Sequence, residues 1–248
     1  TNPHVQRAAA ELLSRHPGPI TYQPLIALYD KVPDHDTHLK YTILLAVRNH
    51  LLMGETLKQV INGTWSREEA DLIALVISDI PSDYTGNFLL QHLKNYPQPQ
   101  DRQLAYVESI ARSIPASEMG KVIDFVKNQS ITDIDFQYRL AMATHQGMEQ
   151  RGGKPNALLQ KWYVELATGF LNQTPESAAE WTDQIRAQQK YASEVAGRYK
   201  VKSLVPRIQK LLTSPYADEE SRAMAAGALM DIAPERNAQL VADALYDG

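Results

Sequence analysis

Prolines divide this sequence into segments of similar length. Six of the 14 prolines follow stretches in which apolar residues recur with helical spacing: Pro17, Pro33, Pro81, Pro97, Pro115 and Pro234. A proline ends a helix because it lacks an N–H group and its ring clashes with the preceding turn. The gaps from Pro17 to Pro33 and from Pro81 to Pro97 are both 16 residues long. Each such gap holds one helix of about 12–15 residues, near the usual length in globular proteins.

The apolar residues between these prolines step by three and four positions. One series is Leu104, Val107, Ala111 and Ile114, and another is Ile134, Tyr138, Ala141, His145 and Met148. Alternation with period two is not sustained anywhere, so the sequence predicts an all-α fold of about 11 to 14 helices without a sheet. Ser66 with Glu69 three residues later has the pattern of a capping box. Thr174 followed by Pro175 predicts another helix start.

Two segments of the chain share one plan and indicate an internal repeat. Residues 20–51 and 201–232 each open with a helix that carries a proline in its first turn, Pro24 or Pro206. A short acidic turn follows, and then a second helix rich in Ala and Leu. The opening stretch 2–17 has the character of such a second helix alone. Repeats of this size predict stacked antiparallel helix pairs, and we expect one repeat domain over residues 1–248.

The repeated segments resemble HEAT repeats, which are antiparallel helix pairs that stack into an α-solenoid. The resemblance rests on "LVPRIQKLL" followed by "DEESRAMAAGAL", and on "NPHVQRAAAELL" near the start, about a third of the chain. In that family the first helix often carries a proline, the turn an Asp, and the second helix an Arg before small residues. Pro206, Asp218 and Arg222 match this pattern. Arg7 stands near the corresponding position of the first half-repeat, where Asn2 replaces the Asp. The resemblance implies structural roles for these residues.

A narrower similarity concerns large exported bacterial proteins. "DTHLKYTILLAVRNHL", "ASEVAGRYKVKSLVPRIQKLL" and "ESAAEWTDQI" are similar to their HEAT-like segment, which lies beside haem-binding, dehydrogenase-like or keto-disaccharide hydrolase domains. This similarity implies a fragment of a longer chain in a periplasmic or other extracytoplasmic compartment. The chemistry would then belong to the neighbouring domains. The start "TNPHVQRAAA", without an initiator Met or a signal pattern, is what we expect of such a fragment.

Composition narrows the possible functions. The chain has no cysteine, which excludes thiolate catalysis, disulfides and cysteine-ligated zinc. Its formal net charge of −4 disfavours nucleic-acid binding, which counterion release drives through basic residues. The longest apolar run, residues 72–77, is too short to cross a bilayer. We therefore expect no nucleic-acid partner and no membrane insertion.

The stretch "DHDTH", residues 34–38, concentrates potential metal ligands. His35 and His38 are three residues apart and could share a helix face and a metal ion, with Asp34 or Asp36 alongside. The alternative is helix-start chemistry, since the stretch follows Pro33 and an aspartate there can cap a helix. We prefer the cap, and we expect no metal and no cofactor.

Other candidates also have structural interpretations. His50 and His145 lie on apolar stripes, which is typical of hydrogen-bonded core histidines. "RGGKP", residues 151–155, lacks the preceding strand and the spacing of a P-loop and is better explained as a glycine C-cap. Several aromatic residues could line a carbohydrate or peptide groove, but we expect most of them to pack between repeats: Trp65, Trp162, Trp181, Tyr84, Tyr163 and Tyr191.

Three functions remain open at this point. The first is a non-catalytic scaffold that binds a protein partner or neighbouring domains of its own chain. The second is a helical-repeat enzyme resembling alkylpurine-DNA glycosylases, which would require a basic groove with aromatic residues. The third is a HEAT protein similar to bilin lyases, but no specific residue supports this function. Fold alone does not decide among them.

Overall fold

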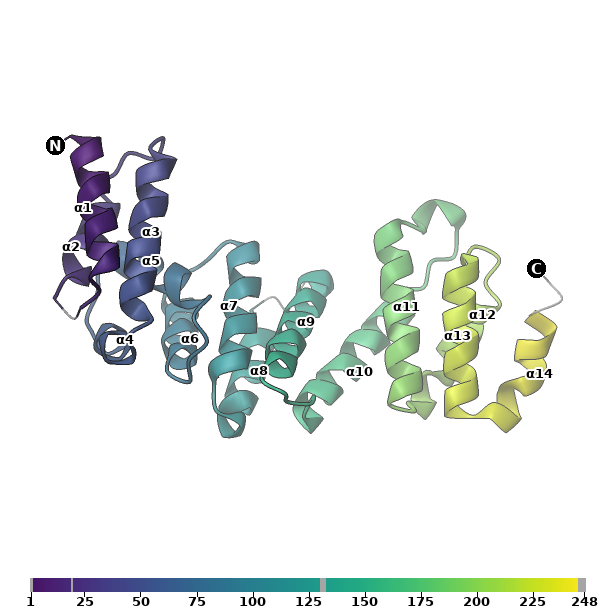
Figure 1. Ribbon diagram of the computed structural model, residues 1–248. Helices are drawn as coiled ribbons and strands as arrows, with labels where there is room; N and C mark the ends of the chain where they lie inside the picture. Colours follow the sequence, from purple (N-terminus) through teal and green to yellow (C-terminus); the bar gives the residue numbers. More distant parts are fainter. Residues whose placement is uncertain (1, 19, 130–132, 245–248) are drawn as a thin grey trace. The chain divides into compact units, whose positions relative to one another are not determined.

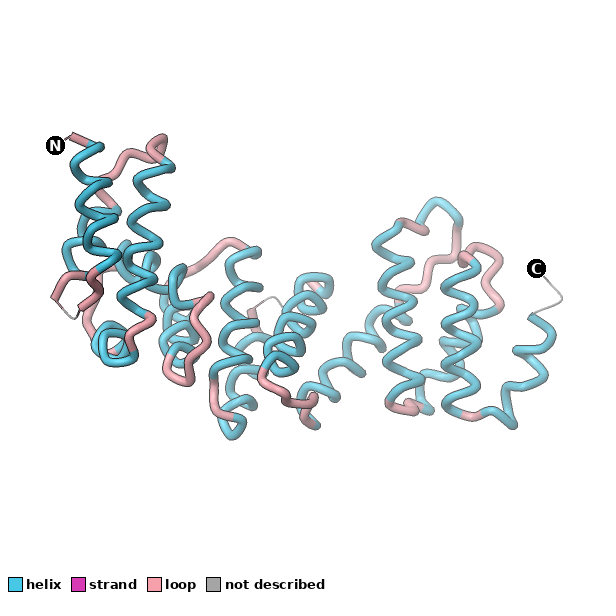
Figure 2. The backbone as a smooth tube through the Cα atoms, viewed as in Figure 1, coloured by secondary structure: helices cyan, strands magenta, loops and turns pink. Residues whose placement is uncertain are grey.

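The computed structural model describes residues 2–18, 20–129 and 133–244 of the chain (Figure 1). Helix accounts for 75% of the structure, and the described residues contain no strand (Figure 2). The helices are α1 (Pro3–Arg15), α2 (Tyr22–Tyr29), α3 (Thr37–Leu51), α4 (Gly54–Ile61), α5 (Arg67–Ile77), α6 (Thr85–Asn95), α7 (Gln100–Ser113), η1 (Ala116–Glu118), α8 (Met119–Lys127), α9 (Ile134–Gln150), α10 (Ala157–Asn172), η2 (Ala178–Glu180), α11 (Asp183–Arg198), η3 (Lys202–Leu204), α12 (Val205–Leu212), α13 (Glu219–Ile232) and α14 (Pro234–Ala244).

The all-α prediction is confirmed, with 14 α-helices in the described part of the chain. The six prolines singled out in the sequence each lie within four residues beyond the end of a helix. Pro234 also opens the next helix, where its missing N–H group costs little. The proline positions therefore mark the helix boundaries correctly.

Of the two predicted helix starts, one is confirmed and one is wrong. Ser66 caps α5 in a full capping box, in which its side chain accepts from the Glu69 N–H and the Glu69 carboxylate accepts from the Ser66 N–H. Thr174 begins no helix, because its hydroxyl instead donates to the Leu171 carbonyl at 2.9 Å and ends α10. The N-cap of the following helix α11 is Thr182, whose hydroxyl accepts from the Ile185 N–H.

The two segments that share a plan fold into corresponding helix pairs. Residues 20–51 contain α2 and α3, and residues 201–232 contain α12 and α13. Within each pair the two helices pack against each other, as α6 and α7 or α10 and α11 also do. In these four pairs the odd-numbered helix is the second member. Odd-numbered helices also contact one another, most extensively α1 with α3 and α11 with α13.

The chain divides into two compact units. Unit 1 comprises residues 1–128 and 142–154, and unit 2 comprises residues 129–141 and 155–248. Helix α9 therefore contributes its first half to unit 2 and its second half to unit 1. Each unit has its own apolar core, built around Tyr106 and Ile110 in unit 1 and around Trp162 and Phe170 in unit 2.

Candidate functional site

Large apolar side chains that remain exposed within helices gather on the odd-numbered helices. Seven such side chains lie inside the described helices, and six of them are on odd-numbered ones: Val5, Leu12, Tyr41, Leu45, Met142 and Met230. The exception is Leu158 on α10. Single exposed apolar residues are normal on a protein surface. Their concentration on the odd-numbered helices makes these helices the candidates for contact with a partner.

In unit 1 this surface contains a groove between α3 and α5. The groove has a volume of about 220 Å³ and is lined by Tyr41, Leu44, Leu45, Arg48, Leu75, Val76 and Asp79. Tyr41 is 61% exposed and Leu45 is 42% exposed, one helical turn apart. Arg48 and Asp79 add one charge of each sign. Such a groove suits an apolar side chain presented by another polypeptide.

In unit 2 a more polar pocket opens between α9 and α11. It has a volume of about 380 Å³ and is lined by Asp135, Tyr138 and Arg139 of α9 and by Gln184, Ala187 and Gln188 of α11. This volume lies near the lower end of the range for ligand pockets, roughly 300–1,000 Å³. We call it the α9–α11 pocket.

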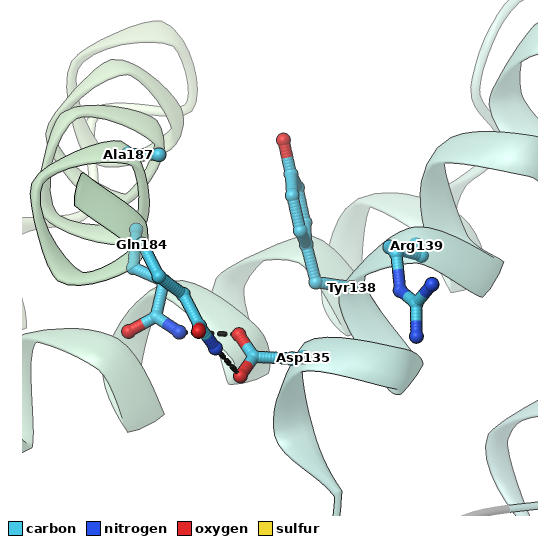
Figure 3. A pocket seen from close by; sticks show the side chains of 6 residues that line it. Asp135, Tyr138, Arg139, Gln184 and Ala187 are labelled. Carbon is cyan, nitrogen blue, oxygen red and sulfur yellow. Dashed lines mark hydrogen bonds between the residues drawn. The ribbon is translucent and has the colours of Figure 1, made fainter. Parts of the chain in front are cut away.

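The carboxylate of Asp135 is the polar centre of this pocket. Gln184 and Gln188 both donate to it through their side-chain amides (Figure 3). Because a carboxylate only accepts, these bonds fix the orientation of both amides. Gln188 is 5% exposed, and its Oε1 is buried without a hydrogen-bond partner in the part of the chain that the structure describes. The glutamine amides are therefore held in place by the carboxylate.

Another wall of the pocket is aromatic. The ring of Tyr138 extends away from the Asp135 carboxylate in Figure 3 and lies 4.5 Å, centroid to centroid, from the ring of Tyr191. Burial raises the pKa of Tyr138, and the Glu194 carboxylate adds to this effect. Burial raises the pKa of Tyr191 as well. Both phenols are therefore neutral at pH 7, and their rings offer an uncharged aromatic surface.

Arg139 is the one cation that lines the pocket. Its guanidinium lies 5.3 Å from the centroid of the Phe136 ring, in a cation–π contact. Figure 3 shows its side chain directed away from Gln184 and from the Asp135 carboxylate. Among the described residues Asp135 forms no ion pair within 4 Å, and its carboxylate is held by the two glutamine amides in the first turn of α9, where the helix end favours a negative charge.

Unit 1 also contains a buried histidine that forms a polar cluster. His92 Nε2 lies 3.0 Å from Asp71 Oδ1, and the Gln98 amide donates to the same oxygen. Burial lowers the pKa of His92, although the Asp71 carboxylate acts in the opposite direction. Tyr106 packs edge-on against the imidazole, and burial raises its pKa to about 12. Because His92 is almost fully buried, we interpret the cluster as part of the core.

The "DHDTH" stretch starts a helix in the structure. Asp36 caps α3 by accepting from the Leu39 N–H at 3.0 Å, which is the interpretation that we preferred. Asp34 pairs with Lys40, while His35 and His38 are exposed. Among the described residues, no three His, Asp or Glu side chains are placed so that they could hold a metal ion together. That the chain binds no metal stays a prediction.

The two histidines on apolar stripes differ in their environment. His50 is fully buried, and its Nδ1 accepts from the Gly18 N–H at 3.0 Å, as expected for a core histidine. His145 is largely buried, and its Nε2 lies 2.9 Å from a carboxylate oxygen of Glu149. Neither contributes to a pocket described here.

Four residues were predicted to have structural roles. In the structure, each of them lies at a helix start or in a contact between helices. Pro206 is in the first turn of α12, and Asp218 caps α13 by accepting from the Ser221 N–H at 2.9 Å. Arg222 Nε donates to the Leu212 carbonyl at 3.1 Å, and a guanidinium nitrogen lies 3.5 Å from the Ala244 carbonyl. Arg7 lies 3.8 Å from the Asp36 carboxylate.

The other residues singled out in the sequence have structural roles or lie beside the α9–α11 pocket. Gly152 follows α9 with φ of 75°, a left-handed conformation that favours glycine and ends the helix. Trp162, Trp181 and Tyr163 are buried, and Tyr84 is exposed. Among the aromatic candidates, Tyr191 packs against a residue that lines the α9–α11 pocket.

The α9–α11 pocket was missed by reasoning from sequence. Asp135 and Gln188 are 53 residues apart, and neither belongs to a recognisable motif. The available signal was weak: two glutamines four residues apart on one helix, Gln184 and Gln188, and an aspartate three residues before a tyrosine.

Comparison with known proteins does not supply a family. The chain matches no protein-family model, and no curated protein or solved structure matches it either. None of the helices described is long and apolar enough to cross a membrane.

Proposed function

We propose that the chain is a non-catalytic, HEAT-like scaffold that binds a protein partner or a neighbouring domain through its odd-numbered helices. The observation that carries this proposal is the concentration of exposed apolar side chains on those helices. A groove in unit 1 and a pocket in unit 2 both open between successive odd-numbered helices. In repeat proteins, stacked helix pairs offer extended surfaces to their partners.

The chemistry of this surface favours a polypeptide as the ligand. The α3–α5 groove is mainly apolar and carries two opposite charges at its edge, Arg48 and Asp79. An alkylpurine-DNA-glycosylase-like enzyme would need a basic surface for phosphates, and the net charge of −4 speaks against one. That this chain is a segment of a large exported protein, as its sequence similarity implies, is also part of the proposal.

Selection from a random peptide library displayed on phage tests this function. The immobilised full chain should enrich peptides with a shared pattern of apolar residues. The double substitution Tyr41→Ser with Leu45→Ser should weaken binding of peptides that use the α3–α5 groove by tenfold or more, since each apolar side chain buried contributes about 1.5–3 kcal/mol. Both side chains are exposed, so the variant should fold normally.

Leu158→Ser on α10 is the matched control, because it removes an equally exposed leucine from an even-numbered helix. It should leave peptide binding unchanged. The proposal fails if no common pattern is enriched, or if the control and the double variant lose binding equally. Release of an alkylated base from a duplex oligonucleotide would instead favour the enzyme.

A further inference from the structure

A further pocket of unit 2 lies where α12 begins and where α13 is followed by α14. Its volume is about 430 Å³, and it is lined by residues within 202–209 and 232–237. This volume falls within the range for ligand pockets, roughly 300–1,000 Å³. We call it the α12–α14 pocket. It shares no residue with the α3–α5 groove or the α9–α11 pocket.

Two cations line the α12–α14 pocket, and no acidic residue does. They are Lys202, in the short helix η3 before α12, and Arg236, in the first turn of α14. Neither side chain forms a hydrogen bond or an ion pair with another residue that the structure describes. Asp231 and Glu235 are neighbours of lining residues in the sequence, but neither lines the pocket. A pocket lined by charges of one sign concentrates ions of the opposite sign.

The polar wall of the pocket satisfies its own hydrogen bonds. Asn237 is 1% exposed, and its Nδ2 donates to the carbonyls of Leu229 and Ala233. Its Oδ1 accepts from Gln209 Nε2 at 2.8 Å. These bonds join α12 to α13 and α14 and fix the wall in place. The two cations are therefore the charged groups of the pocket that are left to bind a ligand.

The other four lining residues are apolar: Val205, Pro206, Ile232 and Ala233. Ile232 is buried, while the other three reach the surface. An inorganic anion would leave this apolar wall in water. A ligand with an apolar part beside its anionic group would cover the wall, and burial of apolar surface favours binding.

The pair of cations favours an anion with two charges. The Arg236 guanidinium can donate two parallel N–H groups to the oxygens of a carboxylate or a phosphate, and the Lys202 ammonium is a second point charge. A carboxylate carries one negative charge. A phosphate monoester carries about −1.5 to −2 at pH 7 and offers three acceptor oxygens. The phosphate monoester therefore matches the charge of the pocket, whereas a carboxylate would leave one cation unneutralised.

We infer that the α12–α14 pocket binds a small phosphate monoester, with Arg236 and Lys202 on its phosphate group and the apolar wall against its organic part. This inference goes beyond the proposed function, because it concerns a small molecule and a site other than the surface proposed for the protein partner.

Titration of the full chain with phenyl phosphate, followed by amide NMR shifts, tests the inference. The shifts should be largest in residues 202–209 and 232–237. Binding should be at least tenfold weaker for benzoate, which carries one charge, and several-fold weaker for inorganic phosphate, which has no apolar part. Equal binding of phenyl phosphate and either of the other two anions, or shifts confined to other parts of the chain, would overturn the assignment.

Two substitutions should each weaken the binding of phenyl phosphate about tenfold. Arg236→Gln and Lys202→Gln each remove one charge-assisted contact to the phosphate group. Both side chains are exposed and make no contact that the fold requires, so the variants should fold like the wild type. Unchanged affinity in either variant would overturn the inference.

Arg207→Gln is the matched control. Arg207 is exposed on α12 directly after the lining residue Pro206, but it donates to Asn172 and does not line the pocket. This variant changes the net charge by the same amount as Arg236→Gln and should bind phenyl phosphate like the wild type. Equal losses in the two variants would mean nonspecific attraction and would overturn the inference.

The two proposals can fail separately. Phenyl phosphate should bind normally to the double variant Tyr41→Ser with Leu45→Ser, and Arg236→Gln should bind selected peptides as tightly as the wild type. Loss of peptide binding in Arg236→Gln would show that the pocket serves the protein partner and would overturn the inference. If phenyl phosphate does not bind at all, the inference is wrong and the scaffold proposal stands.

Discussion

Arginine side chains join successive odd-numbered helices through the aspartates that cap them. Arg7 on α1 reaches the α3 N-cap Asp36 at 3.8 Å, and Arg186 on α11 reaches the α13 N-cap Asp218 at 3.3 Å. Burial raises the pKa of Asp218, but hydrogen bonds from Ser221 outweigh it and hold this pKa below its usual range. Asp218 is therefore ionised at neutral pH and serves both as a cap and as an ion-pair partner.

Arg222 occupies the same place on α13 that Arg186 occupies on α11, four residues after the N-cap. Its hydrogen bonds connect α13 to the last residue of α12 and to α14. Arg222→Ala should lower the free energy of unfolding by about 1.5–3 kcal/mol, the value of hydrogen bonds made by a charged group. Hydrogen exchange should show the loss first in residues 200–244.

Arg198→Ala provides the comparison for this prediction. Arg198 is an exposed residue of α11 that pairs with Glu194 within one helix, and such pairs contribute about 0.3–0.5 kcal/mol. The two variants should therefore differ clearly in the exchange of α12 to α14. Unchanged protection there in Arg222→Ala would show that its contacts do not stabilise this end of the chain.

Close contacts between helices depend on glycine residues, which have no side chain. A Cβ at Gly147 on α9 would lie 2.1 Å from the Glu108 carbonyl oxygen and 3.0 Å from the Arg112 nitrogen, both on α7. These are backbone atoms that cannot move aside independently of the helix. By contrast, a Cβ at Gly227 on α13 would meet nothing within 4 Å.

Gly147→Ala should destabilise the protein by about 1–3 kcal/mol or more, because the added methyl group forces α9 away from α7. Gly227→Ala should stabilise it by about 0.5–1 kcal/mol, since alanine favours a helix interior. Urea unfolding followed by circular dichroism would measure both. Equal shifts of the same sign would contradict the close contact between α7 and α9.

The elements themselves were predictable because their signals are local. Proline positions and three-to-four spacing identify the helices, and an N-terminal aspartate or serine identifies several of their starts. The prediction that Thr174 caps a helix was wrong because a Thr-Pro pair can equally end the preceding helix. Here the Thr174 hydroxyl donates a hydrogen bond to the Leu171 carbonyl at the end of α10. The pocket was not predictable, because it depends on which turn of α9 faces which turn of α11.

Across the whole chain, each compact unit presents a cavity between two of its odd-numbered helices. Unit 1 offers an apolar groove and unit 2 a pocket with a carboxylate at its centre. The even-numbered helices carry one exposed large apolar residue within the described part of the chain, Leu158. This difference between the two classes of helix is the basis of the proposal that each unit binds a partner through its odd-numbered helices.

Hydrogen–deuterium exchange of the full chain, alone and saturated with a selected peptide, would show which helices contact the partner. We expect slower exchange on odd-numbered helices, in α3 and α5, in α9 and α11, or in both pairs. We expect unchanged exchange in the even-numbered helices α2, α6, α10 and α12. Protection that appears mainly on the even-numbered helices would contradict the claim that the odd-numbered helices form the binding surface.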